Sequence, residues 1–502
     1  MKRVIYLLTI SLFFVFCTLS AQTTREEFDK YKQEQKESFD KYVQEQRADF
    51  DKFRDSINAE YAAFMRRSWE EFRAFQGIPV PQSPEPEKPP VADPEKKPAA
   101  EPLSFDRVTP LPPLIPRPEP LVPVPKPTIE PQKPTPETPK APETPAYPFL
   151  FYNTDCKVNL DNTQRFSLPD ISENSVAQAW ETLSNSRYKE LIISCLTLRD
   201  QLNLNDWGYL QMLKTLSEKF LGKESNEAVL LQMYILTQSG YKVRIARSAT
   251  NRLVLLIPSQ DVLYQYSYLK INEIQYYVTN KALRGQSFFV YNREFPKEQY
   301  FSWQTELPNL GVKLNPPKTF TSSSHSEISV SIQTNQNLID FYNDYPLTPA
   351  WNLYVRAGLS ETVKQTLYPA LQNAIAGKTE VQAAALLLDF CQMAFDYKTC
   401  AEQFGYERPF FADENFFFPY NNCKHRATLY ALLVKDLLNL EVVLLHYPGH
   451  LATAVYFSEN VAGDFLTIDG KKFIVCAPTY IGATIGIAME SCKQEKARVI
   501  RL

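Results

Sequence analysis

Glycine is scarce in this chain, at 14 of 502 residues, and neither GxGxxG nor GxxxxGK occurs. That absence excludes the glycine-rich phosphate loops of nucleotide-binding sheets. No CxxC pair occurs, so the sequence offers no zinc ribbon or dithiol centre, and we expect no metal and no cofactor. The net charge is only -3, from 54 basic and 57 acidic residues. With so even a balance there is no basic field to bind nucleic acid.

Long apolar runs are also missing, apart from the one at the N-terminus. Residues 1–21 carry two basic residues, an apolar run and then small residues, which is the layout of a secretory signal peptide. Lipidation at Cys17 is disfavoured by Phe16, where a small residue is needed. An uncleaved anchor stays open, because the run is only slightly short of a spanning helix. We expect export to the periplasm or cell surface, with no transmembrane segment after cleavage.

Cysteine is sparse, and the signal peptide would remove one of the eight residues and leave seven. An odd number in an exported protein implies at least one free or intermolecular thiol. The seven are Cys156, Cys195, Cys391, Cys400, Cys423, Cys476 and Cys492.

An aromatic repeat occupies residues 22–77. Two series, each stepping by eleven residues, run through Phe28, Phe39, Phe50, Tyr61 and Phe72, and through Tyr31, Tyr42, Phe53, Phe64 and Phe75. Eleven residues span three helical turns, so both series stay on one face of an amphipathic helix. Charged residues fill the other faces. The pattern predicts a coiled coil that self-associates through residues 25–76, or else one helix packed back on the globular part; we favour association.

Proline dominates residues 78–148, in runs such as PEPEKPP and KPTPETPKAPETP. A segment with fixed φ and few donors builds no core, which predicts an extended, disordered, polyproline-like linker. Docking of proline-binding modules is the less favoured reading outside the cytoplasm.

Two stretches of the globular part share an order of elements, and we assign them to domains at 149–318 and 319–502. Each has an apolar helix followed by strands: NEAVLLQMYILTQSGYKVRIAR in the first, HRATLYALLVKDLLNLEVVLLHY in the second. Asp469-Gly470 predicts a hairpin turn in the second. The fold class is therefore α+β, with an indicated duplication. The first copy's helix begins near Ser225 and Asn226 without cysteine or a downstream histidine, so we expect it to be degenerate.

Histidine is the rarest chemistry-bearing residue, and three of the four, His425, His446 and His450, lie within thirty residues of Cys423. Asn421 and Asn422 predict a helix cap, which would set Cys423 against first-turn amides that favour a thiolate. Lys424 and His425 add positive charge. His450 follows a turn and opens HLATAVYF, where alternation gives it small neighbours that would leave room for the Cys423 helix.

This order of a helix-borne cysteine, a histidine opening a strand (GHLATAVYF) and a hairpin ending in Pro-Thr (TIDGKKFIVCAPTY) resembles the transglutaminase-like, papain-type superfamily of exported bacterial proteins. The resemblance covers roughly residues 320–502, including TVKQTLYPALQNAIAG, AAALLLDFCQMAFDYK and FGYERPFFADE. It implies a helix carrying the cysteine on an antiparallel sheet, with Cys423 as nucleophile and His450 as base.

The family's aspartate, which stands just before Pro-Thr, falls on Ala477 in this chain. Alanine cannot orient the imidazole, and losing that partner lowers turnover by orders of magnitude. Asp464 and Asp469 lie too far along their strands to replace it, and His446 and His425 are expected to be a packed strand residue and a solvated residue. A Cys423–Cys476 disulfide, which would close the site, also stays open.

The resemblance therefore implies an exported cell-envelope protein that is a catalytically impaired member, a pseudoenzyme binding peptide or protein partners. The alternative is an active cysteine peptidase, amidase or acyl-transferase that uses Cys423 and His450. A third reading is purely architectural, with helix and linker as the functional parts.

Overall fold

The computed structural model describes residues 30, 33, 35–38, 41, 44, 48, 51–66, 69–81, 85–95, 97–111, 116–121, 146–283, 286–304 and 307–502. The chain divides into two compact units, Met1–Phe64 and Met65–Leu502.

The aromatic repeat forms a helix only over part of its expected length. Residues 51–65 are helical, and Phe53 on this helix is 54% exposed. The expected helix to residue 77 is wrong at its end, because Glu70–Arg73 form strand β1. There the alternation of EEFRAF fits a sheet surface: Phe72 and Ala74 pack inward and Arg73 is exposed. Most of residues 22–50, including the start of the predicted coiled coil, lies outside the described residues.

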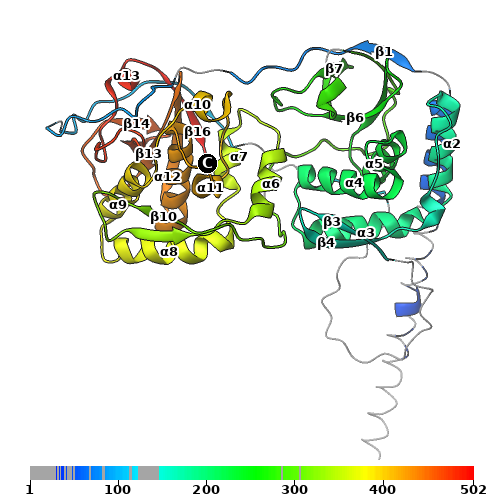
Figure 1. Cartoon of the computed structure of the whole chain (residues 1–502), viewed down its shortest axis with the longest axis horizontal. Coiled ribbons are helices and arrows are strands. Elements are labelled where there is room, and N and C mark those ends of the chain that lie inside the picture. The colour runs from blue at the N-terminus through cyan, green and yellow to red at the C-terminus, as the bar shows by residue number, and fades with distance from the viewer. Residues whose placement is uncertain are drawn as a thin grey trace, which may run out of the picture. The chain divides into compact units, whose positions relative to one another are not determined.

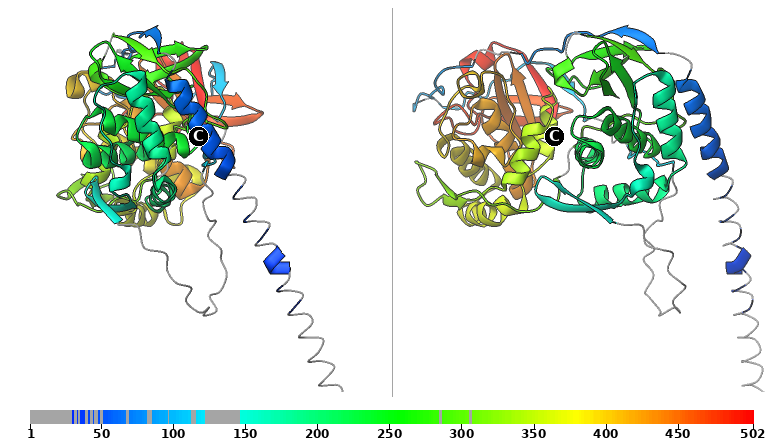
Figure 2. Two further views of the ribbon diagram at one scale, coloured as in Figure 1. Left: turned by 90° about the vertical axis from the view of Figure 1, so that its right-hand side faces the viewer. Right: turned by 45° about the vertical axis from the view of Figure 1, so that its right-hand side comes forward.

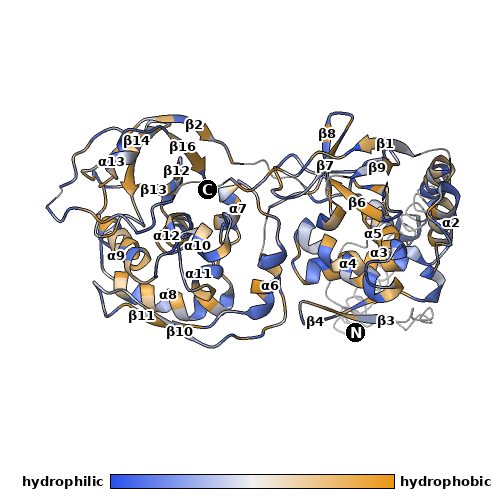
Figure 3. Ribbon diagram, turned by 45° about the horizontal axis from the view of Figure 1, so that its top comes forward, coloured by the Kyte–Doolittle hydropathy of each residue, from blue (hydrophilic) through white to orange (hydrophobic). Residues whose placement is uncertain are grey.

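The first half of the unit Met65–Leu502 is a layer of helices on a six-stranded sheet (Figure 1). Its elements are the hairpin β3 (Ala146–Phe151) and β4 (Thr154–Asn159), the 3-10 turn η1 (Asn162–Gln164), helices α2 (Glu173–Ser184), α3 (Tyr188–Gln201), α4 (Asp206–Leu221) and α5 (Asn226–Gln238), strands β5 (Arg244–Ser248), β6 (Leu253–Pro258), β7 (Tyr268–Ile271) and β8 (Ile274–Val278), the turn η2 (Lys281–Leu283), and β9 (Ser287–Val290). Helix α5 packs on β5 and β6. All of LVLLIP in β6 is buried, and this strand is coloured as hydrophobic in Figure 3.

The second half repeats this layering with more helices. Its elements are the hairpin β10 (Lys318–Thr321) and β11 (Ser329–Ile332), helices α6 (Gln336–Asp344), α7 (Trp351–Arg356), α8 (Glu361–Ile375), α9 (Glu380–Met393), α10 (Cys400–Phe404), α11 (Glu414–Phe417) and α12 (Cys423–Leu438), strands β12 (Glu441–Tyr447), β13 (His450–Tyr456), β14 (Phe465–Ile468) and β15 (Lys471–Cys476), helix α13 (Glu490–Lys493) and strand β16 (Ala497–Arg501). Helix α12 packs on β12, β13 and α9. The α+β class is thus confirmed.

The two sheets have the same strand order. The first runs β7-β8-β6-β5-β9-β1 and the second β14-β15-β13-β12-β16-β2. In each, a helix leads into an antiparallel pair, a hairpin joins one side, and a later strand joins the other. Both hairpins turn on two residues with positive φ, Asn272-Glu273 and Asp469-Gly470, so the turn predicted at Asp469-Gly470 is confirmed.

The sixth strand of each sheet comes from the N-terminal part of the chain. Strand β1 pairs antiparallel with β9, and β2 (Phe105–Thr109) pairs parallel with β16. Strand β2 belongs to the segment predicted as a free linker. The light-blue arrow of β2 lies beside the red and orange strands in both views of Figure 2. The described residues 85–109 are therefore bound to the second half, and we call them the strap.

The many prolines do not prevent this binding, because the strap is held through the amides of its other residues and through carbonyl oxygens. Ala92 donates its amide to Ile481 O at 2.8 Å, and Pro90 O accepts from the Ile481 amide at 2.9 Å. Leu103 donates to Phe465 O at 2.7 Å and is buried in the sheet's core cluster. A proline lacks the N–H donor but keeps its carbonyl oxygen, so it still contributes a hydrogen-bond acceptor.

Among the described helices, none combines the length and apolar character needed to cross a membrane.

Candidate functional site

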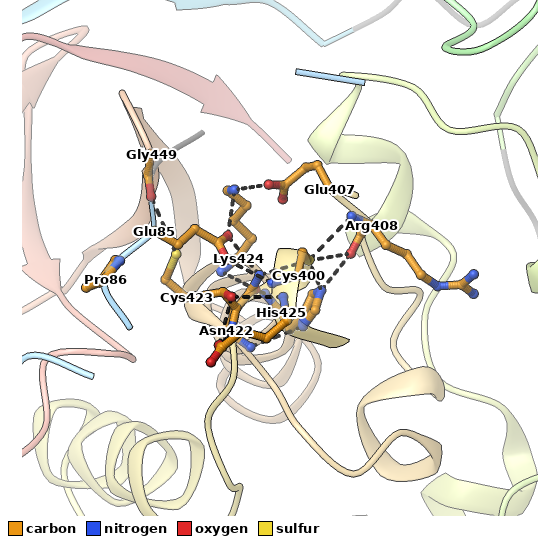
Figure 4. Close-up of polar contacts among 12 residues, drawn as sticks. Glu85, Pro86, Cys400, Glu407, Arg408, Asn422, Cys423, Lys424, His425 and Gly449 are labelled. Carbon is orange, nitrogen blue, oxygen red and sulfur yellow. Dashed lines mark hydrogen bonds and ion pairs between the residues drawn. The ribbon is translucent and has the colours of Figure 1, made fainter. Parts of the chain in front are cut away.

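Helix α12 begins at Cys423, as the sequence predicts, and Asn422 caps it. The Asn422 Oδ1 accepts from the amides of Lys424 at 3.0 Å and His425 at 3.2 Å, which satisfies two first-turn donors. In return the Asn422 amide donates to His425 Nδ1 at 3.2 Å. This reciprocal cap fixes the Cys423 side chain at the end of the helix that lies beside β13 (Figure 4).

The Cys423 thiol faces backbone groups at the start of β13. It is 3.9 Å from Gly449 O, and the Leu451 backbone also contacts it. The residue is only 1% exposed. Burial raises the pKa of the thiol to about 12, and the nearby Lys424 ammonium offsets this only in part. The expected thiolate is wrong for this closed arrangement, because desolvation outweighs the helix terminus.

His450 opens β13 as predicted, but its imidazole does not meet the thiol. No hydrogen bond joins the Cys423 sulfur to the His450 ring within the described chain, and His450 Nε2 is buried without a partner there. Burial, and then the charge of Lys424, lower the pKa of His450 to about 4, so the ring is neutral near pH 7.

Strand alternation explains the separation. Cys476, opposite Thr453 on β15, hydrogen-bonds Tyr430 of α12, so these residues face the helix. Ala452 and Ala454 point to the other face, where they pack with Tyr447 and Val499. His450 shares their parity, and its ring centroid lies 6.5 Å from that of Tyr447. The small-residue face expected to receive the Cys423 helix therefore faces away from it.

The third triad position holds a buried alanine. The Ala477 carbonyl accepts from Gln392 Nε2 at 3.1 Å, and the same amide group donates to Tyr480 O at 2.9 Å and Ala483 O at 3.0 Å. Gln392 thus shapes the turn after β15 through backbone contacts alone. The Ala477 methyl group can orient no imidazole.

The other candidate residues have structural partners. Asp469 pairs with Arg501, and Asp464 accepts from the Ala488 amide at 2.9 Å and pairs with Lys493 at 3.1 Å. His446 is half-buried near Trp351, and burial lowers its pKa to about 4. All seven cysteines in the described part of the chain are free thiols, so Cys423 and Cys476 are not joined.

His425 was expected to be solvated, and that is wrong. The residue is 1% exposed and stacks on Phe410, with ring centroids 3.5 Å apart. Its Nε2 donates to Arg408 O at 2.7 Å. Burial lowers its pKa to about 3, so it is a neutral, fixed part of the cap. The segment around residue 410 covers the His425 ring. This contact depends on the tertiary fold, and no local sequence pattern predicts it.

Glu85 of the strap belongs to the site, although no sequence pattern points to it. Its side chain is 3% exposed, and it reaches the N-terminus of the Cys423 helix (Figure 4). Glu85 Oε1 lies 2.8 Å from Lys424 Nζ and accepts from Asn422 Nδ2 at 2.9 Å. Its Oε2 accepts from the Cys400 amide at 3.0 Å. A glutamate in a proline-rich run carries no sequence signal for such a contact.

Glu85, Cys400 and Glu407 present donor atoms within 4.8 Å of one another, which raises the question of a metal ion. The Lys424 ammonium already contacts both carboxylates, at 2.8 Å from Glu85 and 2.7 Å from Glu407. Burial and the two carboxylates raise the pKa of the Cys400 thiol, which keeps it protonated. This donor set fits an ion-paired lysine and does not fit a metal ion.

The corresponding place in the first half is an open cavity. Helix α5 is capped by Ser225, and its first residue, Asn226, accepts from the Leu253 amide of β6 at 2.9 Å, just as Cys423 contacts Leu451 of β13. By this match Asn226 occupies the position that corresponds to Cys423, and Arg252 occupies the position that corresponds to His450. Ser225, Arg252 and Leu253 line a cavity of about 390 Å³. This half lacks a cysteine and a histidine at those positions.

Comparison of the chain with protein-family models, with curated proteins and with solved structures finds no match in any of the three.

Proposed function

We propose that the protein is an exported cell-envelope protein whose C-terminal half is a transglutaminase-like domain that binds peptides and has lost catalysis. The observation that carries this proposal is the position of Glu85, because an extended segment of the chain lies where a substrate would approach the Cys423 helix. The buried thiol, the imidazole on the other face of the sheet and Ala477 all support binding over turnover.

The repeated strand order supports a further part of the proposal, that the two halves arose by duplication. The matched hairpins, and the matched contacts of Asn226 with β6 and of Cys423 with β13, favour a common origin. On this proposal the first half has lost both reactive residues, whereas the second keeps Cys423 and His450 without contact between them and has lost the orienting acid. We further propose that the aromatic repeat self-associates through its helical part, which ends at residue 65, and so presents several such domains together outside the cytoplasm.

Thiol labelling tests the proposal. The chain from residue 22 onward, without reductant, is treated with iodoacetamide at pH 7, and alkylation at Cys423 is followed by mass spectrometry against time. A protonated, buried thiol reacts slowly. We expect labelling far slower than that of a cysteine in an unfolded peptide, and unchanged by His450→Ala. Fast labelling that falls with His450→Ala would overturn the proposal.

One observation favours the second candidate, a cysteine peptidase or acyl-transferase that is latent under the strap. Cys423 is the first residue of α12, and although burial raises the pKa of its thiol, the Lys424 charge beside it acts in the opposite direction. The same labelling of a Glu85→Gln variant separates the two candidates. Labelling that becomes fast in this variant and depends on His450 supports the latent enzyme. Labelling that becomes faster without depending on His450 reports only the opening of the strap.

A further inference from the structure

The strap contact defines a pocket shaped for one carboxylate side chain. Three donors converge on Glu85: the Lys424 ammonium, the Asn422 side-chain amide and the Cys400 backbone amide. Both carboxylate oxygens are bonded, one twice. The Lys424 side chain is 2% exposed and Asn422 is fully buried, so the donors are held in a buried, fixed site. We call these three groups the carboxylate pocket.

Each donor is held by contacts other than those to Glu85. Asn422 must present its Nδ2 to the strap, because its Oδ1 is engaged by two amides of α12. The Cys400 amide opens α10, and its Sγ accepts from Asn422 Nδ2 at 3.1 Å. Glu407 holds the Lys424 ammonium from a second direction at 2.7 Å. The pocket is therefore built from the C-terminal half alone and does not need the strap for its geometry.

Most other strap contacts near the pocket use backbone groups. Tyr397 donates to Pro86 O at 2.9 Å, and Ile481 exchanges hydrogen bonds with Pro90 O and the Ala92 amide. Ala92 packs in a small cluster with Ala483 and Ile487. The side chains of Glu87 and Lys88 are exposed, and Val91 is 72% exposed. The surface therefore contacts three features of the strap: one buried glutamate, the carbonyl of the proline that follows it, and a small residue seven positions after the glutamate.

We propose that this surface is a recognition site for extended, proline-containing peptides that carry a glutamate followed by proline, and that the strap occupies it in cis. This inference rests on the proposed peptide-binding function and names its ligand class. Backbone bonds supply sequence-tolerant affinity and the carboxylate pocket supplies selectivity, as is usual when an extended peptide docks along a domain. A partner segment of the same chemistry takes the strap's place.

Tethering sets how strongly the strap competes. A covalently linked segment acts at an effective concentration on the order of millimolar, so a free peptide has to displace it. Glu85→Gln keeps the size of the side chain but removes its charge and replaces one acceptor oxygen by an amide donor, so Lys424 loses an ion pair and at least one donor of the pocket faces another donor. That change weakens the strap and leaves the carboxylate pocket intact.

The test uses fluorescence anisotropy with a labelled peptide, acetyl-EPEKPPVADPE, which has the sequence of residues 85–95. The receptors are the wild-type chain and the Glu85→Gln chain, both from residue 22 onward. We expect the peptide to bind the Glu85→Gln chain at least tenfold more tightly than wild type. Replacing the peptide's first glutamate by glutamine should weaken binding at least tenfold, because the lost carboxylate leaves buried donors unpaired. Replacing its second glutamate, the counterpart of exposed Glu87, should change affinity less than twofold.

The outcomes are separable. No binding to the Glu85→Gln chain, or equal losses from the two glutamate replacements, would overturn the inference, whatever the labelling of Cys423 shows. Fast, His450-dependent labelling of wild type would overturn the proposed loss of catalysis, whereas selective binding of the first-glutamate peptide would still identify the pocket. Circular dichroism of the receptor chains confirms that both are folded, and the peptide pair itself leaves the protein unchanged.

Discussion

At the residue scale, the site is governed by desolvation more than by the charges that the sequence places beside it. Cys423, Lys424 and His425 are consecutive and all at most 2% exposed. Local pattern correctly predicts the helix start, the Asn422 cap and the charge of Lys424 near the thiol. It does not predict burial, because the covering groups come from Glu85, Glu407 and Phe410, which are distant in sequence or lie in loops.

Lys424 carries the positive charge that stabilises the two carboxylates of the site, those of Glu85 and Glu407. Lys424→Met removes the only ammonium between Glu85 and Glu407 in the described site and leaves two carboxylates buried without it. We expect a loss of about 3–5 kcal/mol in the free energy of unfolding, measured by urea denaturation. Lys471→Met is the matched control, because Lys471 is 45% exposed beside Glu441 and should change stability by less than about 1 kcal/mol. Similar losses for the two variants would contradict the buried pairing.

The neutral His425 makes stability depend on pH. Its pKa is about 3 in the folded protein and near 6.5 when unfolded, so only the unfolded chain takes up the proton between these values. The stability from this group is complete above pH 6.5 and declines as pH falls toward 3. Asp413 changes in the opposite sense, because burial raises its pKa to about 6, so the total pH profile is a composite.

The difference in stability between the wild-type protein and a His425 variant separates the contribution of the histidine from that of the other titrating groups. His425→Gln cannot protonate, so it should be less stable than wild type at pH 7, and the gap should shrink by about 2 kcal/mol on going to pH 5. Urea denaturation of both proteins at the two pH values measures the gap. A gap that is constant with pH would mean that the folded protein accepts the proton on His425.

At the element scale, the sequence predicts two helix–strand units and the hairpin after the second one well, and the sheet edges poorly. The α12–β12–β13 order, the β14–β15 hairpin and the matching α5–β5–β6 order all follow from apolar patterning and turn residues. Strands β1 and β2 do not, because EEFRAF also fits the helical repeat and FDRVT follows a proline-rich run. Edge strands depend on a partner edge being free, and that is a property of the assembled sheet.

The loop after β15 gives an element-scale prediction from two glycines. Gly482 and Gly486 both have positive φ, but a Cβ at Gly482 would meet no atom within 4 Å, whereas one at Gly486 would lie 2.7 Å from both Ala462 O and Gly463 Cα. Each substitution by alanine carries a backbone penalty of about 1 kcal/mol. Gly486→Ala should cost about 1–3 kcal/mol more, because backbone has to move. Thermal unfolding of the two variants checks this, and equal costs would show that the 462–463 segment yields freely.

At the scale of the whole molecule, the N-terminal part of the chain does more than connect. It supplies the sixth strand of both sheets in the unit Met65–Leu502, and through Glu85 it closes the candidate site. The composition predicted a spacer, because a proline-rich segment cannot build a core. Such a segment can still bind to a domain that has a core of its own. On the proposed function, the strap is a ligand that a partner peptide can replace, and the proposed self-association would bring several straps and carboxylate pockets close together.

The helical repeat gives the prediction at this scale. Phe53 and Phe75 belong to the same eleven-residue series and are similarly exposed, at 54% and 49%, but Phe53 lies on the helix of residues 51–65 and Phe75 stacks on Tyr268 beside β1. If the helix associates through its aromatic face, Phe53→Ser removes apolar area from that interface, and we expect roughly a tenfold weaker self-association. Sedimentation velocity over a concentration series measures this on the chain from residue 22 onward. Phe75→Ser should leave the association constant unchanged, since Phe75 lies outside the helix, and equal effects of the two variants would place the interface elsewhere.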